Sequence, residues 1–272
     1  MASILSKIRR FPSGPRGRGM INQGRRYVSD PLARRQAEKA SPSFNTFGAI
    51  MCLNLDRQPE RWARMVTQFE QLGIAGQVRR IPAIDTPDNH HIGCALSHRR
   101  ALELARQENL HSVLILEDDA MFLQGATWVL RRSLRELERQ SWKLFYLGTL
   151  DGVSQFPLVG DCAYLEAVRG LTAAHAVAYH RRFYDHLLAE LPSDVAGMRA
   201  WIEHHRAIDK YLAATVTTGA FRVRPMVAVQ EGWLKFAEAD LRDQFVVDPA
   251  SQGTRALPRS GAWGRYVARP EH

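Results

Sequence analysis

The chain has 272 residues, of which 45% are hydrophobic and 24% are charged. This near-average composition excludes collagen-like, fully disordered and disulfide-scaffold proteins. The longest aliphatic run, residues 113–116, is far shorter than the roughly 20 residues of a membrane-spanning helix, so no such helix is predicted. The three cysteines Cys52, Cys94 and Cys162 form no CxxC pair. Neither a disulfide framework nor a thiolate zinc site is therefore predicted, and a reducing compartment is expected.

The formal net charge of +9 is concentrated at the start of the chain. Residues 1–46 contain ten basic and two acidic side chains, whereas the rest of the chain is close to neutral. The basic pI therefore describes an arm, and no specific nucleic-acid partner is predicted. Because the arm is rich in glycine and proline and has almost no apolar periodicity, we expect it to be disordered.

One part of the arm is amphipathic: Ile4, Leu5, Ile8 and Phe11 fall on one helical face beside basic residues. This pattern would suit shallow docking on an anionic membrane surface. A solvated tail without a partner, an organelle transit peptide and a separate nucleic-acid-binding arm are the alternatives. The expected location is the cytoplasm, with peripheral contact at the inner face of the membrane as an option.

Apolar runs and amphipathic segments alternate along the next hundred residues. Strands are predicted at 49–55, 78–84, 113–116 and 144–147, and helices at 57–72, 93–107 and 126–140. Asp56 is placed to cap the first helix and Gly73 to end it. This alternation predicts an α/β fold with a mostly parallel sheet and helices on both faces.

The pattern loosens after residue 148. Residues 151–160 are predicted to be a loop, 179–191 and 198–213 helices, and 221–229 a late strand. We therefore expect a single domain over residues 47–250, between the arm 1–46 and a loose basic tail 251–272.

Three acidic residues, Glu117, Asp118 and Asp119, directly follow the apolar strand 113–116. Ligands of open parallel sheets bind at the carboxyl ends of strands. Adjacent carboxylates raise one another's pKa, and a divalent cation such as Mg²⁺ or Mn²⁺ removes that penalty. The alternative is a solvated turn in which one aspartate caps the next segment. The chain has no GxxxxGK[ST] motif, which excludes a P-loop nucleotide site.

Several motifs occur in a fixed order around this triplet. They are Cys52-Leu-Asn-Leu-Asp-Arg-Gln-Pro-Glu-Arg61, Pro82-Ala-Ile-Asp85, Ile92-Gly-Cys-Ala-Leu-Ser-His98, Val113-Leu-Ile-Leu-Glu-Asp-Asp119 and Phe145-Tyr-Leu-Gly148. This succession resembles glycosyltransferase family 25, the lipopolysaccharide-type sugar transferases whose relatives include procollagen galactosyltransferases. The resemblance covers residues 48–148 and continues more faintly through Ile208-Asp209 and Pro225…Gln230.

The resemblance implies a GT-A-like, Rossmann-type fold that takes a nucleotide-sugar donor, often UDP-galactose, and a glycan or glycolipid acceptor. It also implies a divalent metal and inversion at the anomeric carbon, plausibly in lipopolysaccharide or other cell-surface glycan synthesis. The acidic triplet takes the place of the family's DxD element. Asp119 and Asp118 are then the expected direct metal ligands, and Glu117 supports them.

The attack of an acceptor hydroxyl on the sugar requires a general base. By family position, Asp209 is the first candidate, and Asp151, which follows the strand 144–147, is the second. The alternative for Asp209 is a surface carboxylate near Arg206. A different interpretation of the whole chain is a catalytically inactive protein that keeps the fold and binds nucleotide-sugars or serves as a scaffold.

Residues after the first two strands are candidates for donor binding. Asn54 and Arg57 follow the first strand at its ligand-facing end, and an arginine fork there would suit a phosphate. Arg61 is assigned to a solvated helix face. Asp85 is a candidate for the ribose hydroxyls by analogy with acids at strand ends, or else a turn former.

Ser97 and His98 lie in the first turns of the helix predicted at 93–107. Free backbone N–H groups at a helix start attract phosphate, so both residues are candidates for donor binding. His98 would contact the donor phosphate or, equally, pack against the neighbouring strand.

Overall fold

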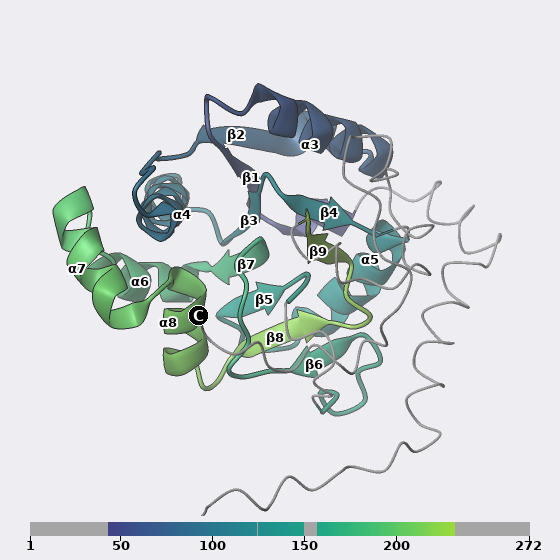
Figure 1. The fold of residues 1–272 in the computed structure, drawn as a ribbon. Helices are drawn as coiled ribbons and strands as arrows, with labels where there is room; N and C mark the ends of the chain where they lie inside the picture. Colours follow the sequence, from purple (N-terminus) through teal and green to yellow (C-terminus); the bar gives the residue numbers. More distant parts are fainter. Residues whose placement is uncertain (1–42, 124, 150–156, 232–272) are drawn as a thin grey trace, which may run out of the picture.

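The structure is a computed structural model that describes residues 43–123, 125–149 and 157–231. These residues form one α/β unit, in which a seven-stranded sheet is covered by helices (Figure 1). In chain order the strands are β1 (Ala49–Asn54), β2 (Val78–Pro82), β3 (Ser112–Glu117), β4 (Ala120–Phe122), β5 (Leu144–Tyr146), β6 (Leu165–Ala167), β7 (Ala176–His180), β8 (Ala220–Val223) and β9 (Ala228–Gln230). The helices are α3 (Pro59–Leu72), α4 (His90–Gln107), α5 (Ala126–Leu137), α6 (Tyr184–Glu190), α7 (Val195–His205) and α8 (Ile208–Thr215), with 3-10 turns η1 (Ser43–Thr46), η2 (Ala75–Gln77) and η3 (Arg181–Phe183).

The strand order in the large sheet is β2-β1-β3-β7-β5-β8-β6. β1 is parallel to β2 and β3, and β8 is parallel to β5, whereas β7 and β6 run antiparallel to their neighbours. β4 and β9 form a separate two-stranded sheet. Since most strands share one direction, the predicted fold class, a single α/β domain with a mostly parallel sheet, is confirmed. The carboxyl ends of β1, β3 and β5 meet at one edge of the sheet.

Both faces of the sheet are buried. Side chains alternate along a strand, so Val113 and Ile115 of β3 pack in the core beneath α4, α6, α7 and α8. Leu114 and Leu116 pack in the opposite core with α3 and α5. All four side chains are completely buried. Burial on both faces explains why this strand is apolar throughout rather than at every second position.

The elements predicted up to residue 147 are found with small shifts in their ends, but the predicted cap of the first helix is wrong. Gln58 occupies the N-cap of α3, and its side chain makes no capping hydrogen bond. Asp56 instead accepts a hydrogen bond from Arg80 of β2 at 2.7 Å. Gly73 ends the helix in the left-handed conformation, with φ of 70°, as predicted.

Three predictions in the second half are wrong. Residues 176–180 form β7 in the middle of the sheet, so the helix predicted from residue 179 begins only at Tyr184. The helix predicted at 198–213 is interrupted at Arg206, whose φ is 71°, which separates α7 from α8. The strand predicted at 221–229 divides into β8 and β9 in different sheets. Pro225 lies between them and offers no N–H for strand pairing.

The packed part of the chain includes residues 43–46, which the sequence placed in the arm. Phe44 in η1 is 1% exposed and contacts Phe122 edge to face at 6.2 Å between ring centroids. The rest of the predicted arm and the whole predicted tail 251–272 lie outside the described residues and stay predictions. No helix in the described ranges combines the length and apolarity needed to cross a bilayer.

A buried ion pair joins β6 and β8, the two strands at one end of the sheet order. Glu166 of β6 and Arg222 of β8 have side chains that are 2% and 6% exposed. Arg222 donates from Nε to Glu166 Oε2 at 3.0 Å and from Nη1 to Thr149 Oγ1 at 3.1 Å. Removing one partner of such a pair leaves an uncompensated buried charge.

Glu166→Gln is therefore expected to lower the free energy of unfolding by about 3–5 kcal/mol, measured by urea denaturation. The matched control is Glu108→Gln, which removes the carboxylate paired with Arg79 at the surface. An exposed pair of this kind contributes less than about 1 kcal/mol. Equal losses in the two variants would contradict the assignment of Glu166 as a structural anchor.

His180, the last residue of β7, provides a pH-dependent contribution. Its Nδ1 accepts the backbone N–H of Arg182 at 3.2 Å. Burial, followed by the charges of Arg182, His111 and Arg181, lowers the pKa of His180 to about 4. The native state therefore favours the neutral ring. The corresponding stability is present above the unfolded pKa of about 6.5 and is lost as the pH falls towards 4.

His180→Asn keeps a hydrogen-bond acceptor and removes the titration. The decline in Tm between pH 6.5 and 4 is expected to be shallower in this variant than in the wild type. His204→Asn, at an exposed position of α7, is expected to keep the wild-type slope. A His180→Asn slope as steep as that of the wild type would rule out this contribution.

Candidate active site

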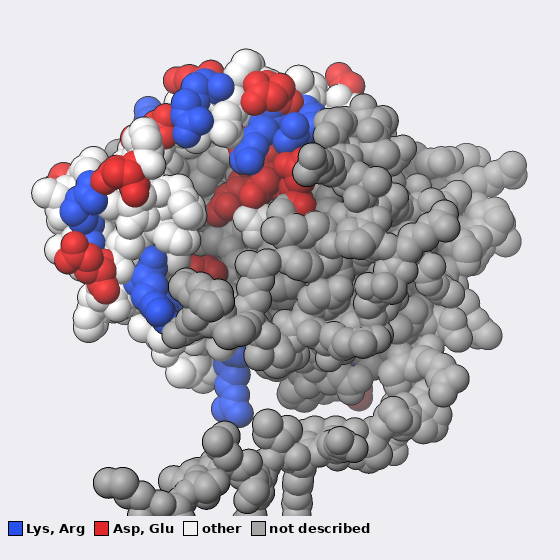
Figure 2. Space-filling view, in the orientation of Figure 1, with Lys and Arg blue, Asp and Glu red and all other residues white. Residues whose placement is uncertain are grey.

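The acidic triplet lies at the edge where neighbouring parallel strands end. Asn54 is the last residue of β1 and Glu117 the last of β3, and Asp118 and Asp119 form the turn into β4. Figure 2 shows acidic side chains gathered near the middle of the face, beside basic ones, in the area of β1 and β3 in Figure 1. The structure thus brings the predicted metal ligands and one predicted donor-binding residue to a single region.

Asp118 is held from two sides. Its Oδ2 accepts a hydrogen bond from Asn54 Nδ2 at 2.7 Å, and its Oδ1 pairs with Arg61 of α3 at 3.0 Å. Asn54 Oδ1 in turn accepts from Arg80 Nε at 2.8 Å. The expectation of a solvated Arg61 is therefore wrong, because this side chain reaches over β1 to a carboxylate that is 9% exposed as a residue. Asn54 acts here as a support for Asp118.

Asp119 has the least compensated charge of the three. Its Oδ2 accepts from Gln230 Nε2 of β9 at 2.9 Å, while its Oδ1 is buried and has no hydrogen-bond partner among the described residues. Burial and then the charge of Glu117 raise the pKa of Asp119 to about 7, against the opposing hydrogen bond from Gln230. Asp118 raises this pKa further. A neighbouring cation would relieve this unfavourable arrangement.

The donor atoms of this turn are compatible with a hard divalent cation. Mg²⁺ and Mn²⁺ take oxygen ligands, and Asp119 Oδ1 is an oxygen that lacks a partner. Each carboxylate oxygen of Asp118 uses one lone pair on Asn54 or Arg61 and retains a second. The orphaned oxygen of Asp119 is the observation on which this compatibility depends.

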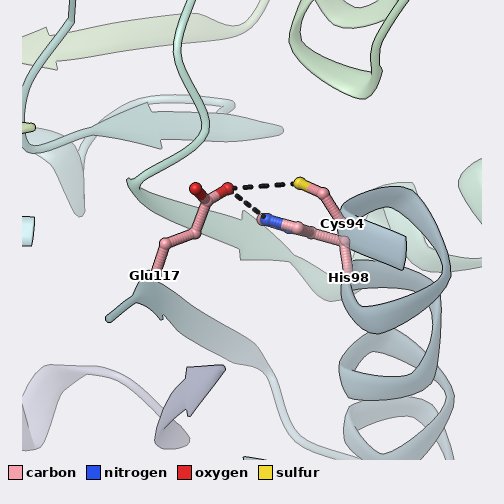
Figure 3. A group of neighbouring side chains, drawn as sticks. All are labelled: Cys94, His98 and Glu117. Carbon is pink, nitrogen blue, oxygen red and sulfur yellow. Dashed lines mark hydrogen bonds and ion pairs between the residues drawn. The ribbon is translucent and has the colours of Figure 1, made fainter. Parts of the chain in front are cut away.

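Glu117 faces α4 instead. Figure 3 shows its carboxylate pointing at Cys94 and His98, which project from one side of that helix. Cys94 Sγ donates to Glu117 Oε1 at 3.4 Å, and His98 Nε2 lies 3.1 Å from the same oxygen. Burial opposes the charge of Glu117, but the hydrogen bond and charge of His98, together with the charge of His175, lower its pKa. The three acids therefore have three different environments.

His98 is completely buried between the helix and the sheet. Its Nδ1 lies 3.2 Å from the hydroxyl of Tyr179 in β7, and its Nε2 faces Glu117. Both ring nitrogens are thus used inside the protein. The ring packs against the sheet, as one of the two interpretations of His98 predicted, whereas contact with a donor phosphate stays a prediction.

The other predicted donor-binding residues do not join the acidic turn. Arg57 and Asp85 bind each other through two hydrogen bonds of 2.5 and 3.2 Å, with side chains that are 57% and 37% exposed. Ser97 is 1% exposed and connects two segments. It donates to Gly93 O at 2.6 Å and accepts from the backbone N–H of Ile84 at 2.8 Å. Ser97 therefore fixes the start of α4 against the loop after β2.

Asp209, the first candidate for the base, lies in the first turn of α8. Its Oδ2 accepts the backbone N–H of Ala173 at 2.9 Å, and its Oδ1 accepts that of Lys210 at 2.8 Å. Burial raises the pKa of Cys94 and of Tyr146, and the charge of Asp209 adds to this rise. Asp151, the second candidate, lies outside the described residues.

Several contacts of this region were missed from the sequence. Because a helix was predicted from Tyr179 onward, nothing in the sequence indicated that this residue lies beside His98. Gln230 ended a segment with a faint family resemblance, but no role was predicted for it. Cys94 and His98 stand one helical turn apart, a spacing that predicts a shared helix face. That spacing could have indicated the pair, although nothing in it indicates Glu117.

Comparison with known proteins gives a consistent result. Residues 88–155 match the sequence profile of glycosyltransferase family 25, described as an LPS biosynthesis protein. A "Glycosyltransferase 25 family member" of Drosophila pseudoobscura pseudoobscura is 35% identical over 104 positions, which cover 28% of this chain and 16% of that protein. The "Inactive glycosyltransferase 25 family member 3" of Mus musculus is 26% identical over 129 positions, which cover 38% of this chain and 22% of that protein.

The chain therefore spans about a fifth of the length of these relatives. Among solved structures, the crystal structure of A197 from STIV aligns with a TM-score of 0.41 and 11% identity, over 82% of this chain and 97% of that one. The profile match over residues 88–155 and the named relatives support an assignment to glycosyltransferase family 25.

Proposed function

We propose that this protein transfers a hexose, with galactose as the first candidate, from a UDP-sugar to a glycan or glycolipid acceptor with inversion at the anomeric carbon. The family assignment supports the reaction class. The observation that carries the proposal is Asp119, a half-buried carboxylate just after β3, one oxygen of which is buried and has no hydrogen-bond partner among the described residues. Such a group at the carboxyl edge of a sheet suits a cation that accompanies a diphosphate.

In this proposal, Asp119 and Asp118 hold a Mn²⁺ or Mg²⁺ ion. The chemistry that such an ion would supply there is Lewis-acid stabilisation of the negative charge on the departing diphosphate. Asn54 and Arg61 fix the orientation of Asp118, and Gln230 fixes that of Asp119. Glu117 supports the turn from its place beside α4.

Asp209 is the proposed general base for the acceptor hydroxyl. Two backbone N–H groups donate hydrogen bonds to its carboxylate and so orient it. Each carboxylate oxygen keeps a further lone pair that can accept a proton. Asp151 is the second candidate. Arg57 and Asp85 are proposed to meet the nucleotide at the exposed rim, where their mutual ion pair would open to admit phosphate or ribose.

The proposed setting is the synthesis of lipopolysaccharide or another cell-surface glycan in the cytoplasm. The basic residues of the arm 1–46 support peripheral contact with an anionic inner membrane face. An acceptor carried by a lipid would then be presented at the same surface.

Asp119→Asn is expected to reduce Mn²⁺-dependent sugar transfer by at least about 100-fold, because a few kcal/mol of charge stabilisation is lost. The measurement is release of UDP from a panel of UDP-sugars with glycan acceptors, with and without a chelator. Glu108→Gln makes the equivalent charge change at the surface ion pair with Arg79 and is expected to retain the wild-type rate. Undiminished, chelator-insensitive transfer by Asp119→Asn would refute the metal-dependent mechanism.

A second candidate function is nucleotide-sugar binding without turnover. The mouse relative named inactive favours it, as does the engagement of both Asp118 oxygens by Asn54 and Arg61. Calorimetry with UDP and Mn²⁺ separates the two functions. UDP binding that is lost in Asp119→Asn, with no transfer by the wild type to any acceptor, would identify a binding protein.

A further inference from the structure

The side chains drawn in Figure 3 have the composition of a transition-metal site. Cys94 and His98 lie one turn apart on α4, and Glu117 reaches them from the end of β3. The donor atoms of these three residues all lie within 4.8 Å of one another. A thiolate, an imidazole and a carboxylate are the ligand types found at zinc sites, whereas Mg²⁺ and Ca²⁺ prefer oxygen alone.

The spacing of the donor atoms suits a tetrahedral ion. Zinc bonds of about 2.3 Å to sulfur and about 2.0–2.2 Å to nitrogen and oxygen place tetrahedral ligands about 3.3–3.6 Å apart. Glu117 Oε1 lies 3.4 Å from Cys94 Sγ and 3.1 Å from His98 Nε2. Two of the three separations are therefore close to those of a tetrahedral site, and all three donor atoms lie within 4.8 Å of one another.

The surroundings of His98 are prepared for ligation. Tyr179 places its hydroxyl 3.2 Å from His98 Nδ1, on the far side of the ring from Glu117. When Nδ1–H donates to this hydroxyl, Nε2 presents its lone pair to the cluster. Metal-binding histidines are typically fixed in this way by a hydrogen bond at the other nitrogen.

A second observation comes from His175, just before β7. Its carbonyl accepts the backbone N–H of Glu117 at 2.8 Å, so the two residues are neighbours across the strands. His175 is 1% exposed, and within the described residues its ring interacts with the backbone of Ala228 but makes no close hydrogen bond to a side chain. This buried imidazole therefore adds a further polar group next to Glu117.

We propose that Cys94, His98 and Glu117 bind a zinc ion, with the fourth position left to water or to a ligand. Binding releases the thiol proton of Cys94 to solvent and moves the proton of a neutral His98 from Nε2, where it faces Glu117, to Nδ1, so the ion meets a thiolate, a neutral imidazole and a carboxylate. This ion is separate from the one proposed at Asp118 and Asp119. It would tie α4 to the end of β3 and hold Glu117 away from the acidic turn.

Cobalt substitution tests the site, because thiolate-bound Co²⁺ absorbs by charge transfer. The untagged, metal-stripped full chain is expected to bind one equivalent of Co²⁺ with this band, and Zn²⁺ is expected to displace it. Cys94→Ser is expected to lose the band. Cys162→Ser is the matched control and is expected to keep it, because Cys162 lies outside the cluster and Cys52 is buried elsewhere.

Tyr179→Phe removes only the hydroxyl beside His98 and is expected to weaken zinc binding by about 10–100-fold while the cobalt band remains. Asp119→Asn is expected to keep the band, so failure of the sugar-transfer proposal and failure of this one are distinguishable. Absence of a thiolate band in the wild type would overturn the proposal and leave a hydrogen-bonded network only. A band that survives Cys94→Ser would overturn it as well, and circular dichroism of each variant shows that it is folded.

Discussion

The arrangement of this protein depends on three negative charges that β3 carries into a largely buried region. A strand that is apolar on both faces ends in Glu117, Asp118 and Asp119, and charged groups in such surroundings require partners. The neighbouring elements supply them unequally. α3 contributes Arg61, α4 contributes His98, and β9 contributes only the neutral side chain of Gln230. Asp119 therefore has the weakest partner of the three acids.

The alternation of side chains along β3 separates the triplet. Glu117 continues the series of Val113 and Ile115, whose core lies under α4, and it contacts α4. Asp118 is held by Arg61 from α3, on the opposite layer. The three consecutive acids therefore do not form one cluster, because their side chains are divided between the two faces of the sheet. This division separates the two metal sites that we propose.

The sequence was sufficient for the first half of the fold and for the location of the acidic turn. There, strands and helices alternate with clear periodicity, and glycine and proline mark their ends. It was insufficient for β7, because Ala176–His180 has no strand pattern of its own and becomes a strand by pairing with β3 and β5. The partners of the acids could not be predicted from the sequence either, since Arg61 and Asp118 are 57 residues apart and Gln230 and Asp119 are 111 apart.

Tyr179 serves both the packing of the core and the hydrogen bonding of His98. Its ring fills the centre of the core beneath α4, and its hydroxyl lies at hydrogen-bonding distance from a histidine that reaches the candidate active site. A chain that drifted to a smaller or differently shaped residue here would lose packing and shift that histidine at the same moment. Natural variation at this position is therefore constrained twice, and a laboratory search for more stable variants has little freedom there.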